Sequence, residues 1–253
     1  MFNKAILRKP CKNLVNGLTT ANLGKPDFQL ALKQHREYFE ALKECGLEVT
    51  VLDADEDYPD STFVEDTALL TPNVTIITNP GADSRREEIN EMSKVIESLF
   101  SNVEYIKDSG RLEAGDVMMV GNHFYIGLSE RTNQEGADQL ISILERYSHT
   151  GSKVALDNIL HLKSGVSYLE NNNLLITIAF TGRFEFNKFN QIVIDDDESY
   201  SANSLWINDK VLVPKGFPNT KLNIEKLGYS TIEVDVSEFR KLDGGLSCLS
   251  LRY

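Results

Sequence analysis

Three residues able to carry nucleophilic chemistry each stand just before an apolar, strand-like segment. Cys248 follows a glycine-rich stretch at 243–247, His161 lies between two leucines, and Glu113 precedes an Ala-Gly-Asp sequence. A thiol has a pKa of about 8.5 and needs a base or a cation to become the attacking thiolate. His161 could supply that base and later act as an acid. An inert buried cysteine and a core histidine are the alternatives that composition alone favours.

Acidic residues surround the first strand-like segment. Asp60 precedes it, and Glu65 and Asp66 open it. Buried carboxylates are costly without a cation, and a guanidinium would satisfy them with planar, charge-assisted hydrogen bonds. The alternative is a solvated acidic loop.

Two arginines lie at unexpected places. Arg85 and Arg131 are each within one residue of the predicted N-terminal cap of a helix, where the helix dipole is already positive. A bound anion such as a carboxylate would explain a cation there, whereas the alternative is a surface arginine tolerated at small cost. Together with the acidic residues and the thiol, these arginines predict a pocket for an arginine-like amino acid.

One unit recurs along the chain: a polar residue opens a strand, a turn of Asn, Asp, Gly or Pro follows, and a second apolar strand closes the hairpin. Copies of this unit occupy residues 65–78, 115–126, 166–178 and 204–213. A last strand at 248–253 could pair with residues 4–8 and close a ring. Cys248, His161 and Glu113 hold the same place in their repeats, so closure about an axis would bring them together.

Amphipathic helices are predicted between the hairpins. One spans residues 28–42 and stops at Gly46, two others begin at capping boxes, and a weaker one runs from residue 220 to Gly228. The boxes are Ser84 with Glu87 and Thr132 with Glu135. The pattern predicts an α/β protein of about five repeated strand-hairpin-helix units in a single domain, residues 1–253. A doubly wound parallel sheet is less favoured, because the strands come in pairs joined by short turns.

Composition narrows the functional classes. The 253 residues are 41% hydrophobic and carry a net charge of −12, which argues against a nucleic-acid binder. Without an uninterrupted apolar run of about 18 residues, we expect neither a membrane span nor export. Cys11, Cys45 and Cys248 are far apart, which fits a reducing, cytoplasmic location. The acidic run at 195–198 is predicted to be a solvated loop, since it lacks the spacing of a calcium site.

Six motifs together make the chain recognisable: Phe63-Val64-Glu65-Asp66, Ser84-Arg85-Arg86, Glu113-Ala114-Gly115-Asp116, Glu130-Arg131-Thr132-Asn133, Leu160-His161-Leu162-Lys163 and Asp243-Gly244-Gly245-Leu246-Ser247-Cys248-Leu249-Ser250-Leu251-Arg252. In these motifs the chain resembles the bacterial dimethylarginine dimethylaminohydrolases of the guanidine-modifying pentein superfamily. The resemblance implies a five-fold pseudosymmetric α/β propeller and a hydrolase that converts Nω-methylated or asymmetrically dimethylated L-arginine to L-citrulline and an amine.

The resemblance also implies a role for each site residue. Cys248 would attack the guanidinium carbon to form a covalent thiouronium, His161 would protonate the departing amine and activate water, and Glu113 would orient His161. The substrate-binding residues would be Glu65 and Asp66 for the guanidinium, Asp60 with the carbonyls of Leu18 and Leu242 for the α-amino group, and Arg85 with Arg131 for the α-carboxylate. No metal or organic cofactor is implied. Thr67 follows the acidic pair where some relatives have proline, which leaves the substrate preference open.

Three other readings are weighed against this one. An arginine deiminase would release ammonia, an amidinotransferase would pass the amidino group to an amine, and a degenerate binding protein would keep only the pocket. The short chain lacks extra segments for a second substrate, and an intact Cys248, His161 and Glu113 argues against the last reading. A homodimer through an apolar helix face is a further expectation.

Overall fold

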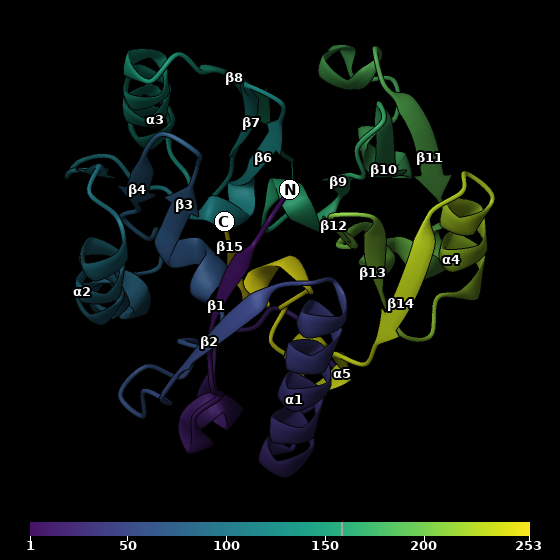
Figure 1. Cartoon of the computed structure of the whole chain (residues 1–253), viewed down its shortest axis with the longest axis horizontal. Coiled ribbons are helices and arrows are strands. Elements are labelled where there is room, and N and C mark those ends of the chain that lie inside the picture. Colours follow the sequence, from purple (N-terminus) through teal and green to yellow (C-terminus); the bar gives the residue numbers. More distant parts are fainter. Residues whose placement is uncertain (158) are drawn as a thin grey trace. The chain divides into compact units, whose positions relative to one another are not determined.

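The structure, a computed structural model, describes residues 1–157 and 159–253 as an α/β protein built from five three-stranded sheets (Figure 1). In every sheet the central strand pairs antiparallel with one neighbour and parallel with the other. Internal contacts divide the chain into two compact units. Unit 1 comprises Met1–Phe63 and Gly165–Arg252, and unit 2 comprises Val64–Ser164 with Tyr253. The single catalytic domain over residues 1–253 stays a prediction.

Unit 1 contains three of the sheets. Their strands, in sheet order, are β15 (Leu251–Arg252), β1 (Lys4–Arg8) and β2 (Glu48–Leu52); β11 (Asn190–Ile194), β10 (Asn173–Thr177) and β9 (Val166–Tyr168); and β12 (Leu205–Ile207), β13 (Lys210–Pro214) and β14 (Ser230–Val234). The predicted pairing of the two ends of the chain is confirmed, with Ala5 opposite Arg252 and Ile6 opposite Leu251. The last strand is shorter than predicted, because Cys248 lies in the 3₁₀ turn η9 (Ser247–Leu249) that precedes it.

Unit 2 contains the other two sheets. They consist of β3 (Ala68–Leu70), β4 (Thr75–Ile77) and β5 (Val103–Tyr105), and of β6 (Val117–Val120), β7 (His123–Leu128) and β8 (Thr150–Ala155). The predicted hairpins are confirmed in both. The third, parallel strand of each sheet was not predicted. β5 and β8 are edge strands with many half-buried or polar residues, so they lack the apolar run that marks the central strands.

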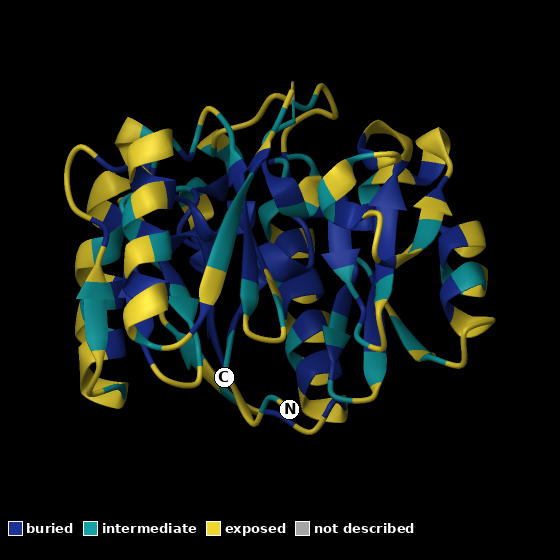
Figure 2. Cartoon of the chain, turned by 90° about the horizontal axis from the view of Figure 1, so that it is seen from above, coloured by how far each residue is buried: buried dark blue, intermediate teal, exposed yellow. Residues whose placement is uncertain are grey.

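Helices connect the central strand of a sheet to its parallel edge strand in unit 2, as a parallel pairing requires. These are α2 (Ile89–Leu99) and α3 (Gln134–Arg146). Unit 1 has α1 (Phe28–Glu44), α4 (Pro218–Glu225) and the short α5 (Ser237–Arg240). Each long helix buries one face and exposes the other (Figure 2). Between β10 and β11 the chain makes the 3₁₀ turns Ile178–Phe180 and Phe184–Phe186.

Both predicted capping boxes are wrong. Ser84 lies inside the 3₁₀ turn η3 (Asp83–Glu88), whose cap is Ala82, and α2 begins only at Ile89. The cap of α3 is Asn133, whose side chain accepts a hydrogen bond from the Gly136 N–H. Consequently Arg85 lies within a 3₁₀ turn and Arg131 two residues before a cap. The helix-dipole argument for these arginines is therefore weaker than predicted.

Other helix ends follow the sequence. Gly46 directly follows the Cys45 cap of α1, and Gly228 lies three residues after α4 ends at Glu225; their φ values of 88° and 90° are in the left-handed region that favours glycine. The acidic run at 195–198 is not wholly solvated as predicted, because Glu198 is buried. Its carboxylate accepts the N–H groups of Asn219 (3.0 Å) and Thr220 (2.6 Å) at the start of α4. An acidic side chain at this helix end is favoured by the dipole.

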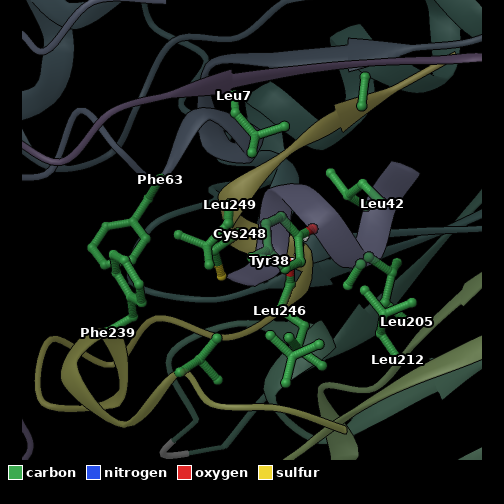
Figure 3. Close-up of a cluster of buried hydrophobic side chains, with 14 of the residues drawn as sticks. Leu7, Tyr38, Leu42, Phe63, Leu205, Leu212, Phe239, Leu246, Cys248 and Leu249 are labelled. Carbon is green, nitrogen blue, oxygen red and sulfur yellow. Dashed lines mark hydrogen bonds between the residues drawn. The ribbon is translucent and has the colours of Figure 1, made fainter. Parts of the chain in front are cut away.

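Each unit has its own apolar core. In unit 1 the largest cluster includes Tyr38, Phe63 and Phe239, and it extends to Cys248 and Leu249 (Figure 3). In unit 2 it is formed by β7 and α3 around Phe124, Leu140 and Leu144. Within the described residues, no helix is both long and apolar enough to span a membrane.

Candidate active site

Short 3₁₀ turns precede the first strand of the repeated hairpins, and these turns carry the predicted site residues. Glu65 and Asp66 lie in η2 (Val64–Thr67), Glu113 caps η4 (Ala114–Asp116), His161 immediately precedes η5 (Leu162–Ser164), and Cys248 lies in η9. Cys248, His161 and Glu113 were predicted to hold the same place in their repeats; each lies in or next to the turn before a strand, but Glu113 and His161 precede their turns whereas Cys248 lies inside its turn. The turns were not predicted, since the residues were expected to open strands.

In unit 2, His161 and Glu113 form a buried pair. His161 Nε2 lies 2.9 Å from Glu113 Oε2, and both side chains are less than a tenth exposed. Burial alone would lower the pKa of His161, but the negative charges of Asp66, Asp116 and Glu113 outweigh it and raise this pKa to about 9. Burial opposes ionisation of Glu113, yet its bond with His161 and the nearby arginines lower its pKa to about 2. The pair is therefore an imidazolium with a carboxylate at neutral pH.

Asp66 stands between this pair and a buried arginine. Its Oδ1 accepts the Gly115 N–H at 3.0 Å, and its Oδ2 lies 2.6 Å from Arg85 Nη1. Arg85 also contacts Glu88, with Nη2 2.9 Å from Oε2. Burial opposes the charge of Arg85, but Glu88 and Asp66 outweigh it and raise its pKa. Arg85 is thus a buried cation held by two carboxylates.

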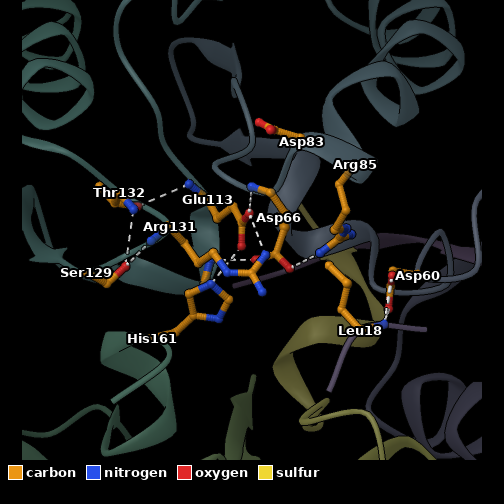
Figure 4. Close-up of polar contacts among 12 residues, drawn as sticks. Leu18, Asp60, Asp66, Asp83, Arg85, Glu113, Ser129, Arg131, Thr132 and His161 are labelled. Carbon is orange, nitrogen blue, oxygen red and sulfur yellow. Dashed lines mark hydrogen bonds and ion pairs between the residues drawn. The ribbon is translucent and has the colours of Figure 1, made fainter. Parts of the chain in front are cut away.

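Arg131 is bound less tightly in the same cluster. Its Nη1 lies 3.5 Å from Glu113 Oε1, and its side chain is 20% exposed. The Ala82 N–H donates to the same Glu113 oxygen at 3.2 Å. Figure 4 shows Arg131, Glu113, Asp66 and His161 pointing toward one another. This charged cluster, Asp66, Arg85, Glu88, Glu113, Arg131 and His161, can hold an ionic ligand and deliver a proton beside it.

Two members of the site were missed by the sequence reasoning. Glu88 follows Arg85 by three residues, a spacing that could have suggested their ion pair. Lys163 Nζ lies 2.6 Å from Glu65 Oε1 with both side chains largely buried, a contact across 98 positions that no local signal indicates. Glu65 therefore already has a cationic partner.

Ligand atoms of Asp66, Glu113 and His161 lie within 4.8 Å of one another, close enough to bind a metal ion. Arg85 and Arg131 already bring positive charge to these carboxylates, however, and His161 is cationic at neutral pH. Metal binding would require a neutral imidazole. The donor set therefore fits a divalent cation poorly.

In unit 1, the turn around Cys248 is held mainly by neutral hydrogen bonds, with one charged donor, Arg252 Nη1, 3.2 Å from the Ser247 carbonyl oxygen. The Gly245 N–H donates to Cys248 Sγ at 3.3 Å, a contact that favours a thiolate. The Asn203 side chain makes two bonds to Ser247, accepting its N–H at 2.9 Å and donating to its Oγ at 3.0 Å. Hydroxyl groups of Tyr38 and Tyr200 donate to the carbonyls of Leu246 and Gly244, at 2.8 and 2.7 Å.

The glycines of this turn are required by space. A Cβ added at Gly245 would lie 2.5 Å from the Asn203 side chain, and one at Gly244 would lie 2.1 Å from the Phe63 ring. Both distances are well below van der Waals contact. The glycine-rich approach to Cys248 thus lets Asn203 and Phe63 pack directly on the backbone.

Asp60, Leu18 and Leu242 lie together in unit 1. The Leu18 N–H donates to both carboxylate oxygens of Asp60, at 3.1 and 3.2 Å. A Cβ at Gly17 would be 2.8 Å from Asp60 Oδ1 and 3.1 Å from Leu242 Cδ1. Asp60 and Leu242 are buried and Leu18 is 39% exposed. The grouping predicted for an α-amino site is present, while its role stays a prediction.

Comparison with known proteins bears on these residues. A family model described as N,N dimethylarginine dimethylhydrolase, eukaryotic, matches residues 23–176. A Pseudomonas aeruginosa protein named N(G),N(G)-dimethylarginine dimethylaminohydrolase is 51% identical over 254 residues, 100% of each chain. A Streptomyces coelicolor protein of the same name is 35% identical and covers 98% of this chain and 96% of its own. The chain belongs to the dimethylarginine dimethylaminohydrolase family. The predicted resemblance is confirmed.

Solved structures of the family share this fold. The P. aeruginosa enzyme, as a cysteine-to-serine variant complexed with citrulline, matches with a TM-score of 0.99 at 51% identity over 100% of both chains. A histidine-to-glycine variant described as an adduct with S-methyl-L-thiocitrulline matches with a TM-score of 0.98. The N-terminal domain of a cyanobacterial arginine dihydrolase has a TM-score of 0.89 at 18% identity, which shows the fold alone. The predicted α/β pentein class with five repeated units is confirmed.

Proposed function

We propose that this member of a hydrolase family converts Nω-methylated or asymmetrically dimethylated L-arginine to L-citrulline and methylamine or dimethylamine. The observation that carries the proposal is the buried His161–Glu113 pair beside Asp66, an acid next to a carboxylate, in a chain 51% identical to a dimethylarginine dimethylaminohydrolase over its whole length. The citrulline complex of a solved relative supports citrulline as the product.

In the proposed reaction, the Cys248 thiolate adds to the guanidinium carbon and forms a C–S bond. The bond from that carbon to the methylated nitrogen then breaks, and His161 gives its proton to the leaving amine. A covalent thiouronium remains on Cys248. Water, losing one proton to the now neutral His161, adds to the same carbon. Breakage of the C–S bond, with loss of the second water proton to solvent, then releases citrulline and restores the thiolate. No oxidant or cofactor enters this balance.

The charge state of His161 refines its role. With a pKa of about 9 the imidazole is already protonated at neutral pH, so it is ready as the acid for the leaving amine. It is then a poor base for removing the thiol proton of Cys248, the first role predicted from the sequence. A cationic guanidinium beside the sulfur would itself favour the thiolate, as would the Gly245 N–H.

Binding roles follow from the charges. Asp66 and Glu65 are proposed to contact the guanidinium, Asp60 with the carbonyls of Leu18 and Leu242 the α-amino group, and Arg131 with Arg85 the α-carboxylate. The structure favours Arg131 over Arg85 as the residue that binds the α-carboxylate. Its side chain is partly exposed with only a 3.5 Å ion pair, whereas Arg85 is buried against two carboxylates.

Product analysis tests the proposal. Purified protein is incubated with monomethyl-, asymmetric dimethyl- and unmethylated L-arginine, and citrulline, methylamine, dimethylamine and ammonia are measured. Citrulline with an equimolar methylated amine is the expected result. Citrulline with ammonia from plain arginine would instead indicate a deiminase, and transfer to an added amine an amidinotransferase. Binding without turnover would leave only a binding protein.

The covalent step has its own test. Acid quench during turnover of the methylated substrate should yield intact protein heavier by the amidino-bearing fragment, located on Cys248 by peptide mass spectrometry. An adduct on Cys11 or Cys45 would contradict the assignment. The homodimer and the cytoplasmic location stay predictions, and light scattering at several protein concentrations tests the first.

A further inference from the structure

Asp116 is a fully buried carboxylate beside the charged cluster. The proposed reaction gives Asp116 no role. It is 0% exposed and is the last residue of η4, the 3₁₀ turn that Glu113 caps. Its two oxygens point to different loops. Oδ1 accepts the N–H of Leu162, the residue after His161, at 2.9 Å, and Oδ2 accepts the Ser129 hydroxyl at 2.7 Å.

Ser129 extends this contact to the loop that carries Arg131. Its Oγ accepts the backbone N–H groups of Arg131 at 3.0 Å and Thr132 at 3.1 Å, as Figure 4 shows. Thr132 Oγ1 in turn accepts the N–H of Glu113 at 3.2 Å. A chain of hydrogen bonds therefore runs from the His161 turn through Asp116 and Ser129 to the Arg131 loop and back to Glu113.

On this basis we propose that Asp116 is a positioning residue that holds the His161 turn and the Arg131 loop in register through its two carboxylate oxygens. The inference rests on the proposed function, in which His161 transfers the proton and Arg131 binds the α-carboxylate. Displacements on the order of 1 Å at such groups can cost about 100-fold in rate. One side chain would thus link substrate binding to proton transfer.

A second observation supports the same role independently. Gly127, on β7, leaves the space in which Asp116 and Leu162 meet, because a Cβ there would lie 2.8 Å from Asp116 Oδ1 and 3.0 Å from Leu162 Cβ. The same Cβ would lie 2.7 Å from Leu156 Cδ1, so a side chain at residue 127 would require the Asp116 carboxylate and the Leu156 side chain to shift. The contact is therefore built into the packing of β7.

Three variants separate positioning from general stability. Ser129→Ala removes the hydroxyl that links Asp116 to the Arg131 loop and leaves the bond to Leu162 intact. Asp116→Asn keeps an acceptor for the Leu162 N–H but removes the charge. Gly127→Ala displaces the Asp116 carboxylate without changing its chemistry. Ser167→Ala is the matched control, since it removes one buried hydroxyl that donates at 2.6 Å to the Ala202 carbonyl in unit 1. Thermal unfolding of all four places their stability losses on one scale.

Steady-state kinetics are measured with a methylated L-arginine and with the matching methylated guanidine that lacks the α-carboxylate. Ser129→Ala should raise KM about tenfold for the first substrate and leave it unchanged for the second. Asp116→Asn and Gly127→Ala should lower kcat about tenfold for both, while Ser167→Ala matches the wild type. If the three variants lower only the unfolding temperature and keep wild-type kcat and KM, the proposal is wrong.

A substrate-free readout keeps this test apart from the proposed function. The ¹⁵N NMR signals of the His161 ring report its bond to Glu113, and they should shift in Asp116→Asn and Gly127→Ala but not in Ser167→Ala. A wild-type protein that fails to hydrolyse any methylated arginine would reject the proposed function alone. Unchanged His161 signals in both variants would reject the positioning role, whatever the activity.

Discussion

The turn around Cys248 and the charged cluster around His161 are organised by different forces. The Cys248 turn is held mainly by hydrogen bonds from the uncharged side chains of Asn203, Tyr38 and Tyr200. Arg252 adds one charged donor, since its Nη1 lies 3.2 Å from the Ser247 carbonyl oxygen. The charged cluster is held by ion pairs among buried carboxylates, two arginines and an imidazolium. Neutral hydrogen bonds fix backbone geometry and are insensitive to pH, whereas buried ion pairs fix charge states and respond to protonation.

This difference suits the proposed chemistry. A nucleophile needs a fixed approach to one carbon atom, which a rigid turn provides. An acid that later serves as a base needs a controlled pKa, which surrounding charges provide. Variants in the two regions should accordingly fail in different ways.

Removing the sulfur gives the largest expected effect. Cys248→Ser should lower kcat by at least about 10³-fold, because a serine hydroxyl is far harder to ionise than a thiol. Citrulline affinity should stay within a few fold of the wild type, because the charge contacts remain. Calorimetry measures the affinity and citrulline formation the rate. Near-native turnover would exclude Cys248 as the nucleophile.

Replacing Arg85 and replacing Arg131 should affect stability and substrate binding to different degrees. Arg85→Ala leaves the buried carboxylates of Asp66 and Glu88 without this cation and should destabilise the fold by about 3–5 kcal/mol. Arg131→Ala removes a longer, partly exposed pair and should cost about 1 kcal/mol or less while raising KM. Urea unfolding and steady-state kinetics measure the two effects. Equal stability losses would contradict the ranking.

Loosening the Cys248 turn should reduce the reactivity of the Cys248 thiol by an amount that does not depend on salt concentration. Asn203→Ala removes both bonds to Ser247 and should slow alkylation of Cys248 by iodoacetamide about tenfold. The size of this effect should be the same at low and high salt. Asn208→Ala is the matched control, because Asn208 makes comparable bonds to Phe2 and Cys45 elsewhere in unit 1. Equal slowing in the control would point to general loosening of the unit.

Raising the pH should weaken the charged cluster and spare the Cys248 turn. The folded-state pKa of His161, about 9, is above its unfolded value, so its contribution to stability is complete below pH 6.5 and is lost as the pH rises through about 9. The melting temperature should therefore fall between pH 7 and pH 10 more in the wild type than in His161→Asn. Parallel pH curves for the two proteins would contradict the shift.

A smaller effect is expected at the acidic side from His35 on α1, outside both regions. Burial lowers its pKa to about 4, so its contribution to stability is present above pH 6.5 and is lost as the pH falls through about 4. His35→Leu should flatten the acid limb of the melting curve while leaving activity at pH 7 unchanged. An acid limb identical to that of the wild type would exclude His35 as its source.

The sequence by itself determined the hairpins, the α/β class and the candidate residues at the start of each repeat. These depend on alternating apolar residues, on turn residues and on motif spacing, all of which are local. Even the pairing of β1 with β15 followed from counting one unpartnered strand at each end of the chain.

Only the tertiary structure decided which polar and charged groups pair with one another. Lys163 pairs with Glu65, Asn203 binds Ser247, and Asp116 joins the loops of Leu162 and Ser129. Each of these partners is chosen by the packing of backbone segments distant in sequence, because a polar group withdrawn from water bonds to whatever donor or acceptor the fold brings within about 3 Å. The residue types alone do not determine the distance between donor and acceptor in the folded protein.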